Sequence, residues 1–145
     1  MKRRVLWLVL PVTLLAACGM PRSPEEQAQR LFRKGEKYIL RSLEAQGASS
    51  RQLQEAQAVL ARHRKGVTEG LAALIRKHRA LFAGVASGKD TEALVALEQA
   101  LHRVHEQTVR RIGAMHEDLE AAVGESLWKA TTAAMASKWA RHGRE

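Results

Sequence analysis

Apolar residues recur at three- and four-residue steps through most of the chain, which predicts amphipathic helices. Between 50 and 86 they also repeat every seven residues, the pattern of a helix that packs along its length on another helix. The repeating positions are Leu53, Leu60, Val67, Leu74 and Leu81. Gly66 and Gly70 lie inside this segment and mark either a bend or a close crossing by a neighbouring helix, of which we favour the crossing.

Capping signals divide this pattern into four helices. Serine or aspartate precedes a helix start, and glycine follows a helix end. The signals are, in chain order, Ser23 with Glu26, Gly47, Ser49 with Gln52, Gly88, Asp90 and Gly124. The sequence therefore predicts an all-α fold of four helices, short-long-long-short.

The reversal at Gly88 is short, so the two long helices are predicted to form a central antiparallel hairpin. We expect the short helices at the open end of this hairpin, together with the start of the chain. The turn at Gly88 would then point away from the point of attachment. A hairpin of this length leaves apolar surface to bury, which favours a groove between its arms or a homodimer.

The first seventeen residues have the features of an export signal. Lys2, Arg3 and Arg4 precede an apolar run that is too short to span a bilayer, and Leu15-Ala16-Ala17-Cys18 follows. This ending resembles the lipobox of bacterial lipoproteins, in which the cysteine is acylated and becomes the new N-terminus. We expect a signal peptide at 1–17, a tether at 18–23 and a helical domain at 24–142.

Cys18 is the only cysteine of the chain, so a disulfide contributes nothing to the fold. Gly19 follows it, which favours the outer membrane, facing the periplasm. The chain has 24 Lys and Arg against 15 Asp and Glu, a net charge of +9. Export excludes nucleic acid as the main partner, so anionic lipid or acidic client proteins are expected instead.

Cationic side chains gather on one face of the first helix. They recur at three- and four-residue steps, so they lie in one line along the helix surface. We call this set the basic stripe: Arg30, Arg33, Lys34, Lys37 and Arg41. It is the predicted partner-binding surface.

No nucleophile with a neighbouring base and no glycine-rich phosphate loop is visible, so we expect a protein that is not an enzyme. Histidine is the commonest metal ligand in proteins, and six histidines are present. Pairing across the hairpin suggests a site for divalent zinc, nickel, cobalt or copper built from His78, Glu98, His102 and His105. Ordinary polar positions are the alternative interpretation of the same residues.

From Glu36 to Met135 the chain resembles the periplasmic Spy/CpxP-like proteins and the CnrX-like heavy-metal sensors. The resemblance rests on helix order, loop placement and the segment from His116 to Trp128, which occupies the place of that family's Leu-Thr-Pro-Glu-Gln motif. It implies an exported helical hairpin that dimerises and that senses or buffers envelope stress.

Together these features predict a lipid-anchored binding protein of the periplasm. It would hold protein clients in a chaperone-like manner, or bind a membrane sensor during a stress response. A metal-binding sensor or buffer is the second hypothesis. A structural accessory of a secretion or conjugation machine is the third.

Overall fold

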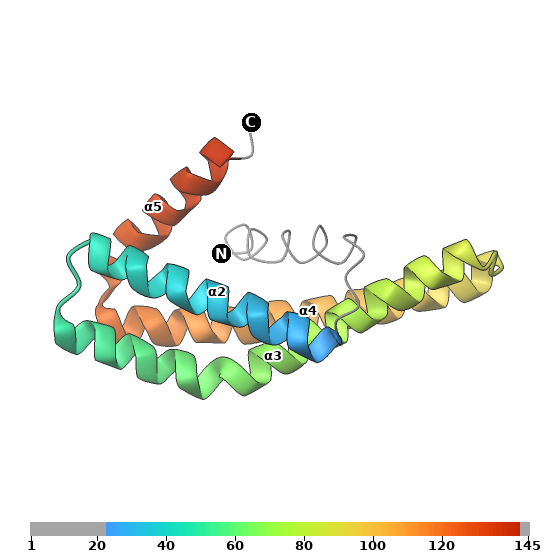
Figure 1. Cartoon of the computed structure of the whole chain (residues 1–145), viewed down its shortest axis with the longest axis horizontal. Coiled ribbons are helices and arrows are strands. Elements are labelled where there is room, and N and C mark those ends of the chain that lie inside the picture. Colours follow the sequence, from blue (N-terminus) through green and yellow to red (C-terminus); the bar gives the residue numbers. More distant parts are fainter. Residues whose placement is uncertain (1–22, 143–145) are drawn as a thin grey trace. The chain divides into compact units, whose positions relative to one another are not determined.

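The computed structural model describes residues 23–142, and these contain four helices. They are α2 (Pro24–Ala45), α3 (Ser50–Ala86), α4 (Thr91–Val123) and α5 (Glu125–His142) (Figure 1). The predicted all-α fold with two long central helices is confirmed. None of the described helices is long and apolar enough to cross a membrane.

The predicted capping residues begin and end these helices. Ser49 Oγ accepts a hydrogen bond from the backbone N–H of Gln52 at 3.2 Å, and Gln52 Oε1 accepts one from the N–H of Ser49 at 2.9 Å. This reciprocal pair is a capping box. Gly47 and Gly88 take positive φ values of 87° and 69°, the conformation that ends a helix at glycine with the least strain.

The described residues pack as two compact units, one formed by 23–32 with 65–113 and the other by 33–64 with 114–142. In the first unit, the opening of α2 lies beside the hairpin of α3 and α4 (Figure 1). Its buried apolar residues are Ala28, Phe32, Val67, Leu71, Ala72, Leu74, Ile75 and Ile112. Thr108 is also fully buried there, and its hydroxyl donates to the carbonyl of Val104 at 2.8 Å.

Gly70 allows the two arms of the hairpin to approach closely. A Cβ at this position would lie 2.9 Å from Oγ1 of Thr108, closer than side chains pack. The prediction of a close crossing is confirmed at Gly70 and wrong at Gly66, where a Cβ would meet nothing within 4 Å. The carbonyl of Gly66 instead accepts a 2.7 Å hydrogen bond from Arg111.

The start of α2 does not lie at the open end of the hairpin, so that prediction is wrong. Glu25 forms an ion pair with Arg76, well along α3, and the hairpin continues past this point to Gly88 (Figure 1). The reason is the short connection between Ala45 and Ser50, which makes α2 run back antiparallel along α3. Since α2 has 22 residues, its first residue lies beside a point about one α2 length along α3 from the start of α3.

In the second unit, the end of α2, the start of α3, the end of α4 and the start of α5 share one core. Its buried apolar residues are Ile39, Leu43, Ala56, Val59, Leu60, Met115, Leu119, Val123 and Trp128. Gly124 separates α4 from α5 with a φ of 93°. The side chain of Gln52 donates to the carbonyl of Val123 at 2.7 Å, which fixes this corner against the start of α3.

Candidate binding surfaces

The basic stripe lies on the face of α2 opposite its core residues. Arg30, Arg33, Lys34, Lys37 and Arg41 are all exposed. On the other side of the helix Phe32, Ile39 and Leu43 are buried. Because burial of this apolar side fixes the rotation of α2, the cations are presented together to solvent.

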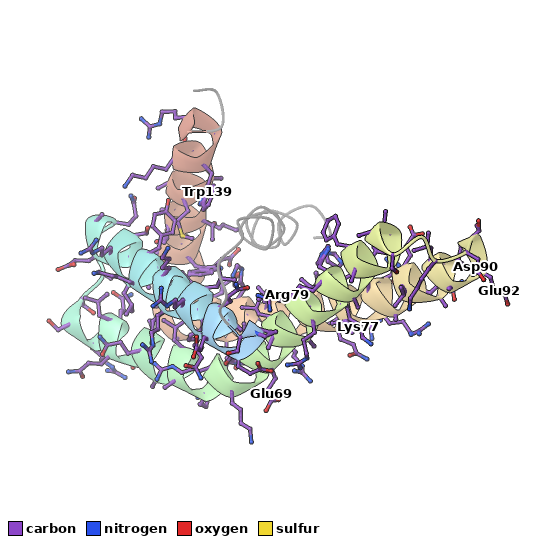
Figure 2. The ribbon with its side chains drawn as sticks, turned by 45° about the vertical axis from the view of Figure 1, so that its right-hand side comes forward. Glu69, Lys77, Arg79, Asp90, Glu92 and Trp139 are labelled. Carbon is purple, nitrogen blue, oxygen red and sulfur yellow. The ribbon has the colours of Figure 1, made fainter. Side chains whose placement is uncertain are left out.

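An aromatic residue borders the stripe within the second unit. Tyr38 is half-buried, and burial raises the pKa of its hydroxyl. The ammonium of Lys138 on α5 lies 6.0 Å from the centre of the Tyr38 ring, within the range of a cation–π contact. Trp139 follows Lys138 on α5 and is 49% exposed (Figure 2). This surface therefore combines cations with aromatic faces.

The predicted metal ligands are not gathered into one site. Among residues 23–142 no group of three or more His, Cys, Asp and Glu side chains could hold a metal ion. His102 and Glu98 are exposed, and His102 Nε2 lies 3.4 Å from Oε1 of Glu106, one turn along α4. His78 on α3 and His105 on α4 interact electrostatically across the hairpin. The pKa of His78 is lowered by burial and, in second place, by the neighbouring His105.

In the second unit, His63 pairs with a carboxylate. His63 Nε2 lies 2.7 Å from Oδ2 of Asp118, and Arg62 reaches the same oxygen at 3.3 Å. The hydrogen bond with His63 is the main cause of a lowered pKa at Asp118. Arg62 and His63 on α3 thus hold the carboxylate of Asp118 on α4 at the surface of the second unit.

His116 is a half-buried histidine of α4 that is not among the predicted site residues. Its ring meets Trp128 edge-on, with 5.3 Å between the ring centres. Its Nε2 atom is buried without a hydrogen-bond partner, and burial lowers the pKa of the imidazole to about 4. The sequence does indicate that His116 lies beside the core, because it directly follows the core residue Met115 and lies three residues, about one helical turn, before Leu119.

The proposed lipidation site, Cys18, lies outside the described residues, as does the signal segment 1–17. No protein-family model, curated protein or solved structure matches the chain. The resemblance to the Spy/CpxP-like and CnrX-like families therefore stays a prediction.

Proposed function

We propose that the chain is a lipid-anchored, periplasm-facing helical protein that binds other polypeptides without catalysing a reaction. The supporting observation is the exposed basic stripe on α2. A row of cations on a stable helix suits acidic or partly unfolded client proteins, because opposite charges raise the rate of encounter. Tyr38 adds aromatic area beside the stripe for contacts with apolar client segments.

A metal-binding sensor or buffer is the second candidate, and the nearness of His78 and His105 favours it. A tetrahedral site would use these two imidazoles and two further ligands. The remaining ligands would come from outside this pair, since the described residues do not complete such a group. Metal binding would then depend on a further protein chain or on solvent.

The first prediction concerns the anchor. Cys18→Ser removes the thiol that acylation requires, so fatty-acid labelling should be lost and the processed protein should leave the membrane fraction. Metabolic labelling with a palmitate analogue and membrane fractionation measure both effects. A Gly19→Ser variant is the control and should remain labelled. Membrane retention of Cys18→Ser after normal cleavage would contradict the anchor.

The second prediction concerns client binding. Replacing Arg33, Lys37 and Arg41 together by Gln should raise the protein concentration needed to suppress aggregation roughly tenfold at low salt. The measurement is light scattering of an acidic protein that aggregates when its disulfides are reduced. Added salt should likewise weaken the suppression of aggregation by the unmodified protein, because charges are screened beyond about 10 Å at 0.1 M.

The matched control replaces Lys65, Arg103 and Arg110 by Gln. These residues are exposed and lie outside α2, so the net charge changes equally while the stripe is kept. Equal loss of suppression in both triple variants would mean that net charge, and not the stripe, attracts the client. Stabilisation by zinc that His78→Ala abolishes, without any suppression of aggregation, would favour the metal hypothesis instead.

A further inference from the structure

Large apolar side chains are exposed on the part of the hairpin that extends past α2. Phe82 is 61% exposed, Val85 59% and Val95 43%. We call these three residues the distal patch. All three belong to the first unit, two on α3 and one on α4. Exposed apolar side chains that gather on one face of a small protein indicate a contact surface.

On α3 the distal patch continues the face that is buried nearer the start of the helix. Leu71, Ile75, His78 and Phe82 follow one another at steps of four, three and four residues, so they share one face. Leu71 and Ile75 are buried, His78 is half-buried and Phe82 is exposed. This face becomes exposed beyond the start of α2, which lies beside Arg76. Past this point no described helix covers the hairpin on this side (Figure 1).

On α4 the corresponding face carries Val95, His102 and His105, at steps of seven and three residues. His105 lies close enough to His78 to lower its pKa, which puts this face of α4 next to the same face of α3. Between the arms, Leu97 packs where Gly84 leaves room, since a Cβ there would lie 2.9 Å from Cδ1 of Leu97. The two arms therefore present the distal patch on one side.

The length of chain before α2 indicates what this side faces. Five peptide links separate Cys18 from Ser23, and a fully extended chain covers at most about 18 Å over that distance. Phe82 and Val85 lie six and nine residues past Arg76, which is about 9 and 14 Å along the helix. A lipid attached at Cys18 thus holds the surface of the membrane within reach of the patch.

Charge along this part of the hairpin is almost balanced. Residues 76–106 include five Lys and Arg and four Asp and Glu, with Asp90 and Glu92 near the turn (Figure 2). An anionic or cationic partner has little to attract it here. Contact through the distal patch would depend on apolar area and would change little with salt, unlike contact through the basic stripe.

We propose that the distal patch inserts shallowly into the phospholipid surface to which acylated Cys18 attaches the chain. The inference rests on the lipid anchor of the proposed function. Phe and Val side chains suit the boundary between headgroups and acyl chains, where interfacial segments bury their apolar face. The anchor and the patch would then both contact the membrane, and the first unit would lie along its surface.

The test uses a spin label on the acylated full-length protein in vesicles of phosphatidylethanolamine and phosphatidylglycerol. Acylated Cys18 has no free thiol, so Val85→Cys gives a single labelling site. Ala83→Cys is the matched control, because Ala83 is exposed on the same helix but two residues away, on another side. Flotation of the vesicles, read on the same samples, reports the anchor separately.

The expected result is a label at Val85 that becomes at least threefold less accessible to a water-soluble nickel chelate on vesicles, while the label at Ala83 is unchanged. Phe82→Ser should restore access at Val85. Flotation with equal access at both sites would overturn the inference and leave the anchor intact. Shielding of Val85 without vesicles, in protein carrying Cys18→Ser, would also overturn it, with dipolar broadening of the spectrum indicating a second copy as the occupant. Failure to float would refute the anchor and the inference together.

Discussion

Leu74→Asp is expected to lower the free energy of unfolding by several kcal/mol, about 3 to 5, which is enough to unfold a marginal domain. Leu74 is fully buried in the core of the first unit, among Leu71 and Ile75. A carboxylate there has no partner and loses its hydration, so the folded state must either bury the charge or take up a proton. Denaturation in urea, followed by circular dichroism, measures the change.

Glu69→Gln is the control for this variant. Glu69 is exposed on the same helix, and its nearest cation, Arg111, is 4.0 Å away. Its replacement should change the free energy of unfolding by at most about 0.5 kcal/mol. Equal urea midpoints for the two variants would refute the assignment of the buried face of α3.

Helix ends were the most predictable feature of the fold, because capping depends on residues close together in sequence. Asp90 accepts a hydrogen bond from the backbone N–H of Ala93 at 2.8 Å, and Ser23 accepts one from Glu26 at 3.2 Å. Gly124 likewise takes the positive φ that separates α4 from α5. A few neighbouring residues suffice for each of these contacts, so they can be inferred without the tertiary structure.

The depth of burial along the seven-residue repeat could not be predicted in the same way. Leu60, Val67 and Leu74 are buried, whereas Leu53 and Leu81 are only half-buried. All five are leucine or valine at equivalent positions, so the sequence gives no reason to distinguish them. Leu81 differs because it lies beyond the start of α2, and burial depends on how far the neighbouring helix extends.

The predicted metal ligands do not meet because of the way the two arms of the hairpin, α3 and α4, are aligned. Contacts of Gly70 with Thr108 and of Gly84 with Leu97 set the alignment of the two arms. This alignment brings His105 toward His78, while His102 pairs with Glu106 on its own helix. Counting residues from the turn gave the approximate level along the hairpin. It did not give the direction of each side chain, which depends on helix rotation and packing.

The other large effect expected is a loss of stability in acid that depends on His116. Its pKa is about 4 in the folded protein, because the ring is buried, against 6.5 for an ordinary histidine. Between these pH values the unfolded chain binds a proton that the folded chain does not, so stability falls as the pH falls from 6.5 toward 4. The expected loss from this group is about 2 kcal/mol between pH 7 and 5, and about 3 kcal/mol by pH 4.

His116→Leu should remove this contribution, because leucine cannot take up a proton and can still pack against Trp128. Urea denaturation at pH 7 and pH 5 should therefore show a fall in stability about 2 kcal/mol smaller in His116→Leu than in the unmodified protein. Gln107→Leu is the control: Gln107 is exposed on the same helix and carries no ionisable group, so its replacement should leave the pH dependence as it is. If His116→Leu lost as much stability in acid as the unmodified protein, the burial of a neutral imidazole against Trp128 would be refuted. The loss of stability between pH 7 and 5 would then have to come from another group. Asp118 is not that group, because its lowered pKa confines its own contribution to a lower pH.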